Sequence, residues 1–453
     1  MRLLTLSNFY PPHSRGGYEQ WCHEVTERLR ARGHEVEVLT SRFAGAGVVE
    51  RDAPWVHRDL RLEMEFDSLW NAARFFTARH ADRRKNLERL RTLIRAFKPE
   101  CVLVWGMWNL HRSLPALAEH ACPNRVAYYV GDYWPTLPTQ YEPYWESPAR
   151  GWMASILKAP LRVVARRLIA REHVPDVEFR HLMFPTSFMR DELSRRGIRG
   201  TVSRIVSGAI DISLYVPLTE RDRGSDPDPV RLLWAGRLTS EKGVDDAIVA
   251  LGILLHESHI SRVRLTVVGS GEASYERHLR ALAQQHGVGD LVTFLGAQPK
   301  EVMPELYGEA DIFLFTSTWP EPFGRVIVEA MASQLAVVGS ATGGAAEILV
   351  DGRNALVVKP GDARDLAGAV GRLVDSPRLR EQLAQRARQD AVEQFDVERM
   401  TTGIEDFLRE MAAGRLEPGG REAGIAIDRG GVRNPGNPAI MRSDGVGLAS
   451  RPT

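Results

Sequence analysis

The sequence predicts an α/β protein built from two doubly wound halves, each with a parallel sheet covered by helices. Short apolar segments typical of buried strands alternate with longer amphipathic segments through most of the chain. This alternation starts again after a charged segment with Gly and Pro at 218–229, which is typical of a linker. Two such halves facing each other would leave a cleft between them.

Length and composition support this organisation. The 453 residues exceed one compact core and suggest about two domains, and 43% hydrophobic content is typical of globular proteins. A net charge of +1 gives no overall bias toward nucleic acid. The cysteines, Cys22, Cys101 and Cys122, are scattered and lack metal-ligand spacing. We therefore expect reduced core thiols in a cytosolic protein, with neither disulfides nor a metal site.

The expected domains are residues 1–215 and 216–395, followed by a helix at 396–412 that crosses back to the first half. The tail at 413–453 is rich in Gly, Pro and Arg, which predicts disorder. No apolar run reaches the about 18 residues of a spanning helix. The first apolar residues are soon followed by Pro11 and Pro12, so they are interpreted as a strand and not as a signal peptide.

In the first half, a strand at 3–7 leads through a loop with Gly16 and Gly17 into a helix that ends at Gly33, before a strand at 35–40. This is the opening unit of a doubly wound domain, and glycines in its first loop allow close approach to a ligand. A glycine pair alone is more often a plain turn. Further buried strands are expected at 101–106 and within 125–134. A helix ending near Gly197 follows residues 181–187, and residues 201–217 close the first half.

Two segments of the first half are strongly basic. Residues 74–98 carry nine Lys and Arg against Asp82 and Glu88, with apolar residues at helical spacing, which predicts one long amphipathic helix. Residues 151–173 interleave apolar and basic residues in the same way. Such a helix can lie on an anionic bilayer, although packing on its own domain is more common. The aromatic residues between 128 and 145 suit sugar stacking, an amphipathic interface or the core.

In the second half, strands are expected at 231–236, 264–268, 291–296, 312–317, 336–340 and 354–358, with helices between them and from 362 to about 412. The segment 321–329 sets Glu321 and Glu329 at the junction of a strand and a helix. Prolines and a glycine keep the backbone out of helix until about Arg325, which leaves the first helical amides free to face an anion. Glu329 falls among apolar helical residues and therefore needs a partner. The plainer alternative is a capping carboxylate and a surface Glu.

A second signal lies at 235–243, where a loop with Arg237 and Lys242 follows an apolar strand. Loops at the carboxyl ends of parallel strands line the ligand crevice of an open sheet. Two cations there could neutralise a diphosphate, and two carboxylates across the crevice could hold sugar hydroxyls. This combination predicts a nucleotide sugar as the ligand.

These motifs resemble a known family. The glycine pair before a helix, RGHEVEVLT, AGRLTSEKG, VVGSGE, EPFGRVIVEAMAS and GGAAEILVDGRNALVV are together similar to the retaining GT-B glycosyltransferases of family four, over residues 1–410. The resemblance implies the GT-B fold, with an acceptor-side first domain and a nucleotide-sugar-binding second domain. It implies sugar transfer with retention, by a route in which the departing phosphate helps to deprotonate the acceptor.

The resemblance also implies roles for individual residues. Arg237 and Lys242 would bind the donor diphosphate and stabilise the leaving group, and Glu321 would bind the transferred sugar. No metal or other cofactor is implied, because the cations take the place of a metal ion. The donor-binding residues would be Gly16, Gly17, Gly236, Gly269, Gly296, Phe323, Gly324 and Glu329, with Glu329 on the ribose and Gly269 and Gly296 beside the nucleoside.

One departure concerns the acceptor side. Many relatives have a histidine followed by an aspartate after the strand near Tyr129, whereas this chain has Gly131 and retains Asp132. Asp132, Tyr133 and Trp134 are the candidate acceptor-side residues. His13, His111 or His120 could replace the missing histidine from elsewhere. A second departure is SGAID at 207–211, where relatives commonly have an Asn-Gly-Val-Asp type of turn, and it affects only the segment between the domains.

The leading hypothesis is a cytoplasmic hexosyltransferase that extends a cell-surface polysaccharide or glycolipid, with possible contact to the inner face of an anionic membrane. The base, the sugar and the acceptor stay open. One rival is a nucleotide-sugar epimerase on the same fold, which would need acid and base groups around the sugar. The other is a binding protein with impaired catalysis, which only Gly131 favours.

Overall fold

The computed structural model describes residues 1–416, except residue 15 and the segments 44–51, 67–69, 148–151 and 218–228. For residues 152–157 only the backbone is described. The predicted linker at 218–229 therefore lies almost entirely outside the described residues, as does the predicted disordered tail beyond residue 416.

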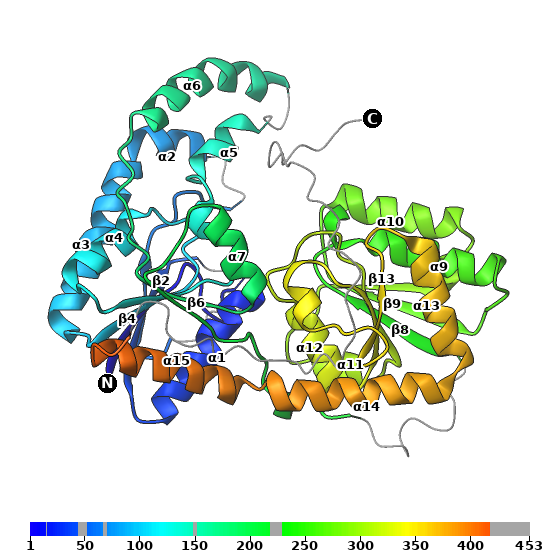
Figure 1. Ribbon diagram of the computed structural model, residues 1–453. Helices are drawn as coiled ribbons and strands as arrows, with labels where there is room; N and C mark the ends of the chain where they lie inside the picture. Colours follow the sequence, from blue (N-terminus) through cyan, green and yellow to red (C-terminus); the bar gives the residue numbers. More distant parts are fainter. Residues whose placement is uncertain (15, 44–51, 67–69, 148–151, 218–228, 417–453) are drawn as a thin grey trace.

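The first half, on the left of Figure 1, contains a parallel sheet. Its strands lie in the order β3-β2-β1-β4-β5-β6-β7. The residues of the central strands β4, β5 and β6 are all buried, which explains their continuous apolar sequences. The edge strand β3, VHRDL, has no such run and was not predicted. The strands are β1 Arg2–Leu6, β2 Glu35–Ser41, β3 Val56–Leu60, β4 Cys101–Val104, β5 Val126–Tyr129, β6 His181–Phe184 and β7 Val202–Ile205.

The helices of this half are α1 Gly17–Ala31, α2 Asn71–Thr77, α3 Arg79–Phe97, α4 Ser113–Ala121, α5 Tyr141–Glu146, α6 Trp152–Ala170 and α7 Ser187–Arg195. The single helix predicted at 74–98 is wrong, because the segment forms α2 and α3 with a break at Ala78. The break lets Phe75 pack edge-on against Tyr141 and Trp145 of α5, with ring centroids 5.0 and 5.5 Å away. Contacts with α5 thus accompany the boundary between α2 and α3.

The second half contains the parallel sheet that the alternation of strands and helices predicts. Its strands lie in the order β10-β9-β8-β11-β12-β13. Its strands are β8 Val230–Ala235, β9 Val263–Val268, β10 Val292–Gly296, β11 Ile312–Phe315, β12 Ala336–Ser340 and β13 Ala355–Val358. Its helices are α9 Val244–His256, α10 Ala273–Gln285, α11 Met303–Gly308, α12 Arg325–Ala332 and α13 Ala363–Asp375. The fold class is therefore α/β with two doubly wound domains.

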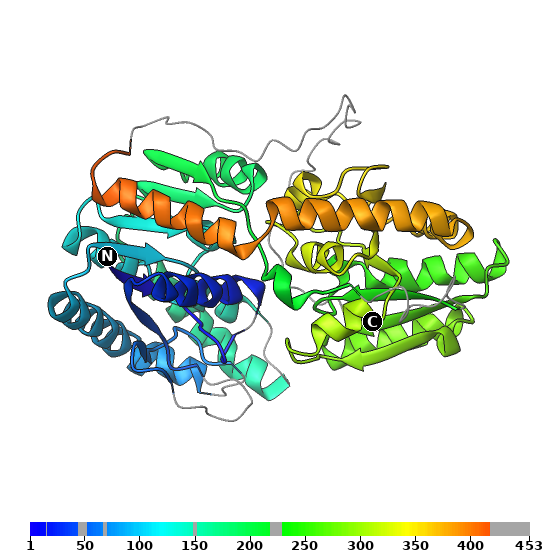
Figure 2. The ribbon, with the colours of Figure 1, turned by 90° about the horizontal axis from the view of Figure 1, so that it is seen from below.

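Two C-terminal helices connect the halves along one side (Figures 1 and 2). Helix α14, Pro377–Gln394, lies on the second half, whereas α15, Val397–Ala412, lies against α1 of the first. The backbone crosses at Phe395, whose carbonyl accepts from Ile210 N at 3.0 Å. On the α15 side, Glu405 accepts from Arg32 Nη1 at 2.7 Å and contacts His34 Nε2 at 2.9 Å.

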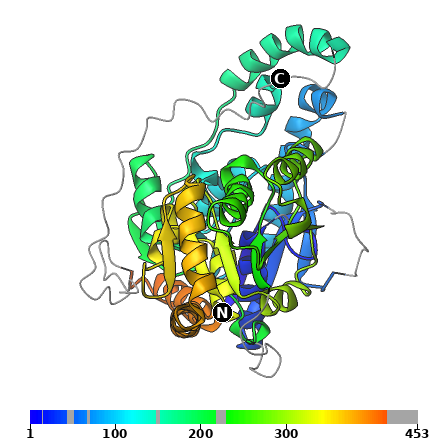
Figure 3. The same ribbon diagram turned by 90° about the vertical axis from the view of Figure 1, so that its right-hand side faces the viewer.

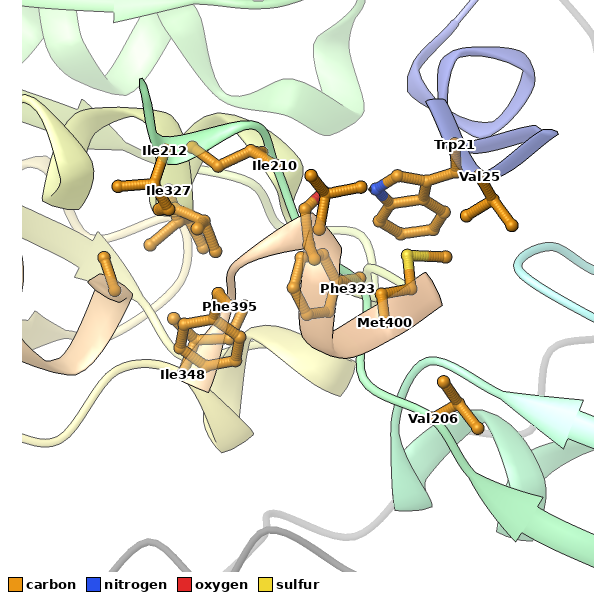
Figure 4. Packing of buried hydrophobic residues seen from close by; sticks show 14 of the residues in the cluster. Trp21, Val25, Val206, Ile210, Ile212, Phe323, Ile327, Ile348, Phe395 and Met400 are labelled. Atoms are coloured by element: carbon orange, nitrogen blue, oxygen red, sulfur yellow. Dashed lines mark hydrogen bonds between the residues drawn. The ribbon is translucent and has the colours of Figure 1, made fainter. Parts of the chain in front are cut away.

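A buried apolar cluster extends across the contact between the halves (Figure 4). Trp21 of α1 lies edge-on to Phe323 of the second half, with ring centroids 5.3 Å apart. Phe323 in turn contacts Phe395 between α14 and α15, with centroids 5.8 Å apart. The three cysteines are buried free thiols, which confirms their predicted place in the core.

Candidate active site

A cavity of about 720 Å³ lies between the two halves. Its walls are loops that follow β1, β4 and β5 on one side and β8 and β11 on the other. This is the carboxyl edge of both sheets, where open α/β folds bind ligands. The predicted residues that line it are Gly16, Gly17, Asp132, Gly236, Arg237, Lys242, Glu321, Phe323 and Gly324.

The predicted cation and carboxylate face each other inside this cavity. Lys242 Nζ forms an ion pair with Glu321 Oε1, and Ser317 Oγ donates to the same oxygen at 2.8 Å. Gly243 fixes the position of Lys242, since it adopts a left-handed conformation with φ 68° in which a Cβ would overlap the Thr316 carbonyl. The loop after β8 therefore packs directly on the end of β11.

Arg237 completes the positive side of the cavity. Its side chain is exposed and has no hydrogen-bond or ion-pair partner among the described residues. A guanidinium without a protein partner can donate to a diphosphate without first breaking a hydrogen bond to the protein. Among the described residues of the wall, Arg237 is therefore a free cation, whereas Lys242 and Arg325 are held by carboxylates.

The loop with Glu321 is held by contacts from the first half. Tyr133 Oη donates to Pro320 O at 3.2 Å, and Thr186 Oγ1 donates to Pro322 O at 2.8 Å. Gly324 then adopts φ 109° immediately before α12. The loop is thus fixed from both sides, and closure of the two halves is part of the geometry of the site.

Glu329 is placed differently from the other predicted residues. It is buried on α12 and does not line the cavity. It does have the partner that its apolar surroundings require: Arg325 Nε donates to Glu329 Oε1 at 3.0 Å, and Tyr307 Oη donates to Oε2 at 3.0 Å. Both carboxylate oxygens thus have partners within the protein, and the ribose contact of Glu329 stays a prediction.

Arg325 also links the two halves. Its Nη1 and Nη2 donate to the Glu24 carboxylate of α1 at 3.0 and 2.7 Å. Burial alone would lower the pKa of Arg325, but the Glu24 and Glu329 carboxylates raise it above its ordinary value. Gly17 leaves room for this side chain, because a Cβ there would lie 2.9 Å from Arg325 Cδ. Sequence reasoning missed this contact, since nothing in the sequence pairs residues so far apart.

The glycine that replaces the family histidine has a structural explanation. A Cβ on Gly131 would lie 2.8 Å from Tyr18 Cε2, and one on Gly106 would lie 3.1 Å from Tyr18 Cε1. The Tyr18 ring, whose hydroxyl donates to Tyr129 O, therefore fills the space of a larger residue at 131. None of His13, His111 and His120 lines the cavity.

Asp132, next to Gly131, does face the cavity. Its Oδ1 accepts from Trp134 N at 2.9 Å, and burial raises the pKa of Asp132 to about 6. A carboxyl group of this kind is mainly ionised at neutral pH and accepts from a sugar hydroxyl, and it can also donate once the pH falls toward its pKa.

The remaining predicted residues lie next to the cavity and not in its wall. Gly269 N donates to Gly296 O at 2.8 Å, and Gly269, with φ 142°, packs so closely on Gly236 that a Cβ would overlap its carbonyl. Tyr133 and Trp134 are buried in the first half. No group of three or more His, Cys, Asp or Glu suited to a metal ion occurs within the described ranges.

Comparison with known proteins agrees with this geometry. Residues 15–214 match the family described as Glycosyltransferase Family 4, and residues 218–390 match Glycosyl transferases group 1. The glycogen synthase of Mycobacterium tuberculosis is 26% identical over 431 residues, which covers 92% of this chain and 97% of that protein.

Solved structures share the fold. Sucrose-phosphate synthase from Thermosynechococcus elongatus has a TM-score of 0.66 at 18% identity, covering 91% of this chain and 99% of that one. Anabaena Alr3699/HepE in complex with UDP and glucose has a TM-score of 0.63 at 20% identity, covering 90% of this chain and 100% of that one. The chain is therefore a group 1 glycosyltransferase of family 4 with the GT-B fold.

Proposed function

We propose that the protein moves a hexose, with retention, from a uridine diphosphate sugar to a glycan or glycolipid acceptor. The observation that carries this proposal is the cavity in which Arg237 and Lys242 lie beside Glu321, opposite the Gly16–Gly17 loop. Cations suit a diphosphate, a carboxylate suits sugar hydroxyls, and the glycines admit a ligand close to the backbone.

Each charged residue of the cavity has a proposed role in the transfer. Arg237 and Lys242 neutralise the charge that develops on the departing diphosphate. In many enzymes, electrostatic stabilisation of this kind makes the largest contribution to the rate enhancement. Glu321, held by Ser317, orients the transferred sugar while its ion pair keeps Lys242 in place. The departing phosphate takes the acceptor proton on the face where the new bond forms. The same cations supply the positive charge that a metal ion would supply, so we propose metal-independent transfer.

Uridine is the proposed base because the Anabaena relative was solved with UDP and glucose. A role in polysaccharide synthesis is supported by the full-length similarity to a glycogen synthase. These relatives make UDP-glucose the first donor to test.

Cleavage of UDP-glucose, followed by proton NMR within minutes of mixing, tests the proposal. We expect slow transfer to water in which the first free glucose has the α configuration of the donor, with the same rate in EDTA. Initial β-glucose would contradict retention, and loss of the reaction in EDTA would contradict metal independence. Appearance of an epimerised UDP-sugar instead would favour the epimerase, and an inert donor would favour a binding protein.

We also propose that α6 contacts an anionic membrane surface. Figures 1 and 3 show α6 at the outer end of the first half, away from the second. Leu161, Val163 and Val164 are 42%, 50% and 49% exposed, beside the exposed Arg162 and Arg167. Basic residues next to exposed apolar ones suit the interface of an acidic bilayer. No helix within the described residues is long and apolar enough to cross a membrane.

Co-sedimentation with liposomes tests the membrane contact. The protein should pellet with phosphatidylglycerol vesicles at low salt and remain in solution with phosphatidylcholine vesicles. Arg162→Glu combined with Val163→Glu should abolish pelleting, whereas Arg277→Glu on α10 should not. Wild-type protein that stays in solution with acidic vesicles would reject the contact.

A further inference from the structure

A second cavity of about 290 Å³ lies in the first half, beside the cavity between the halves. Its walls come from the segments that follow β3, β4 and β5. Trp108 lines both cavities, and Trp134 of the second donates its backbone N–H to Asp132 of the first. The two cavities are therefore neighbours on the same sheet edge.

Hydrogen bonds between the three segments hold the walls of this cavity in place. Asn109 accepts from Met64 N at 2.8 Å and donates to Met64 O at 2.7 Å, which joins the β4 segment to the β3 segment. Glu63 Oε2 accepts from Gln140 N at 2.9 Å, which joins the β3 segment to the β5 segment.

Arg112 adds a third link. Its Nη2 donates to Pro135 O at 2.7 Å and to Leu137 O at 2.9 Å, joining the β4 and β5 segments. A cavity whose walls are cross-linked in this way loses little conformational entropy when it binds a ligand.

Other polar groups of the cavity do not take part in hydrogen bonds between the wall segments. The carboxylate of Glu142 and the side-chain amide of Gln140 have no hydrogen-bond partner among the described residues, and both side chains are partly exposed. Trp108, also partly exposed, adds an aromatic ring to the lining. An aromatic ring combined with unpaired acceptors and donors fits a neutral polyhydroxyl compound. The cavity suits an anion poorly, because the carboxylates of Glu63 and Glu142 lie in its wall and would repel a negative charge. The guanidinium of Arg112 already donates to backbone carbonyls.

We propose that this second cavity binds a neutral saccharide, the terminal sugar of the acceptor, and directs one of its hydroxyls past Trp108 toward Asp132 and the donor. This deepens the proposed transfer function and rests on it. The cavity volume is near the lower end for ligand sites, which fits one sugar residue and not a long chain. Helix α6 packs on α5, which begins with Tyr141 directly after Gln140, so the cavity lies next to the elements that carry the proposed membrane contact.

Saturation-transfer NMR with UDP present tests the site, with the methyl α-glycosides of glucose, galactose, mannose and N-acetylglucosamine as probes. At least one probe should bind the wild type. Thr136 lines the cavity, and Thr136→Trp should fill it and weaken binding of the probe at least about tenfold, which corresponds to a loss of only about 1.4 kcal/mol. The exposed Thr201→Trp should not. Glu142→Gln, at a carboxylate without a structural partner, should weaken binding without changing the melting temperature.

The outcomes separate this proposal from the donor site. No bound probe, or a probe whose binding Thr136→Trp leaves unchanged, would overturn the saccharide site even if UDP still raises the melting temperature. In Glu142→Gln, UDP-glucose should still be cleaved by water at the wild-type rate, while transfer to the bound saccharide falls. A protein that neither binds UDP nor cleaves UDP-glucose would instead refute the proposed function itself.

Discussion

Replacing Lys242 with alanine should lower kcat for sugar transfer by at least about a hundredfold, the usual loss when one electrostatic stabiliser of a leaving group is removed. Lys242 lies in the cavity and forms an ion pair with Glu321. The variant therefore removes charge from the diphosphate and leaves the Glu321 carboxylate unpaired. Glu321→Ala should cost at least as much, because it removes the group that orients the sugar and frees Lys242.

Matched controls are available on the same half of the protein. Lys359→Ala and Glu309→Ala change exposed residues outside the cavity and should leave kcat unchanged. Because Lys242 and Glu321 act as a unit, the double variant should be far less impaired than the product of the single losses predicts. Single variants with activity within threefold of the parent would show that these residues have been assigned wrongly.

Arg325→Ala should destabilise the protein by about 3–5 kcal/mol, the usual result when one partner of a buried charge cluster is removed. The guanidinium bridges Glu24 on α1 and Glu329 on α12, and the side chains of both acids are at most 12% exposed. Without it, Glu24 keeps only the longer contact with Lys300 Nζ at 3.4 Å, and Glu329 keeps the hydrogen bond from Tyr307. Both carboxylates then stay buried with much of their compensating charge lost, and the charged contact between the halves is weakened. A thermal melt should show a drop of several degrees.

The control for this prediction is Arg364→Ala. Arg364 pairs with Glu257 in an arrangement similar to that of Arg325, but both side chains are more than half exposed. Exposed pairs contribute little, so this variant should melt like the parent. Equal melting temperatures for the Arg325 and Arg364 variants would show that the buried cluster does not stabilise closure.

The fold was predictable because its strands are short apolar runs and its helices are periodic. The edge strand β3 was missed because VHRDL has no apolar run, and the break at Ala78 was missed because it depends on Phe75 meeting α5. Sequence position identified the loops with Arg237, Lys242 and Glu321, since carboxyl ends of parallel strands converge. It could not show that Arg325 pairs with Glu24, or that Tyr18 fills the space beside Gly131, because such contacts depend on how distant segments pack.

A thermal-shift titration with UDP, GDP, ADP and their sugar conjugates tests whether the cavity between the halves holds a nucleotide diphosphate through Arg237 and Lys242. A ligand that binds only the folded state raises the melting temperature as its concentration exceeds the dissociation constant. We predict a shift with UDP and UDP-glucose that persists in EDTA and disappears in the Arg237→Ala, Lys242→Ala double variant. No shift with any nucleotide at millimolar concentration, or an equal shift in that variant, would show that Arg237 and Lys242 do not form a nucleotide site.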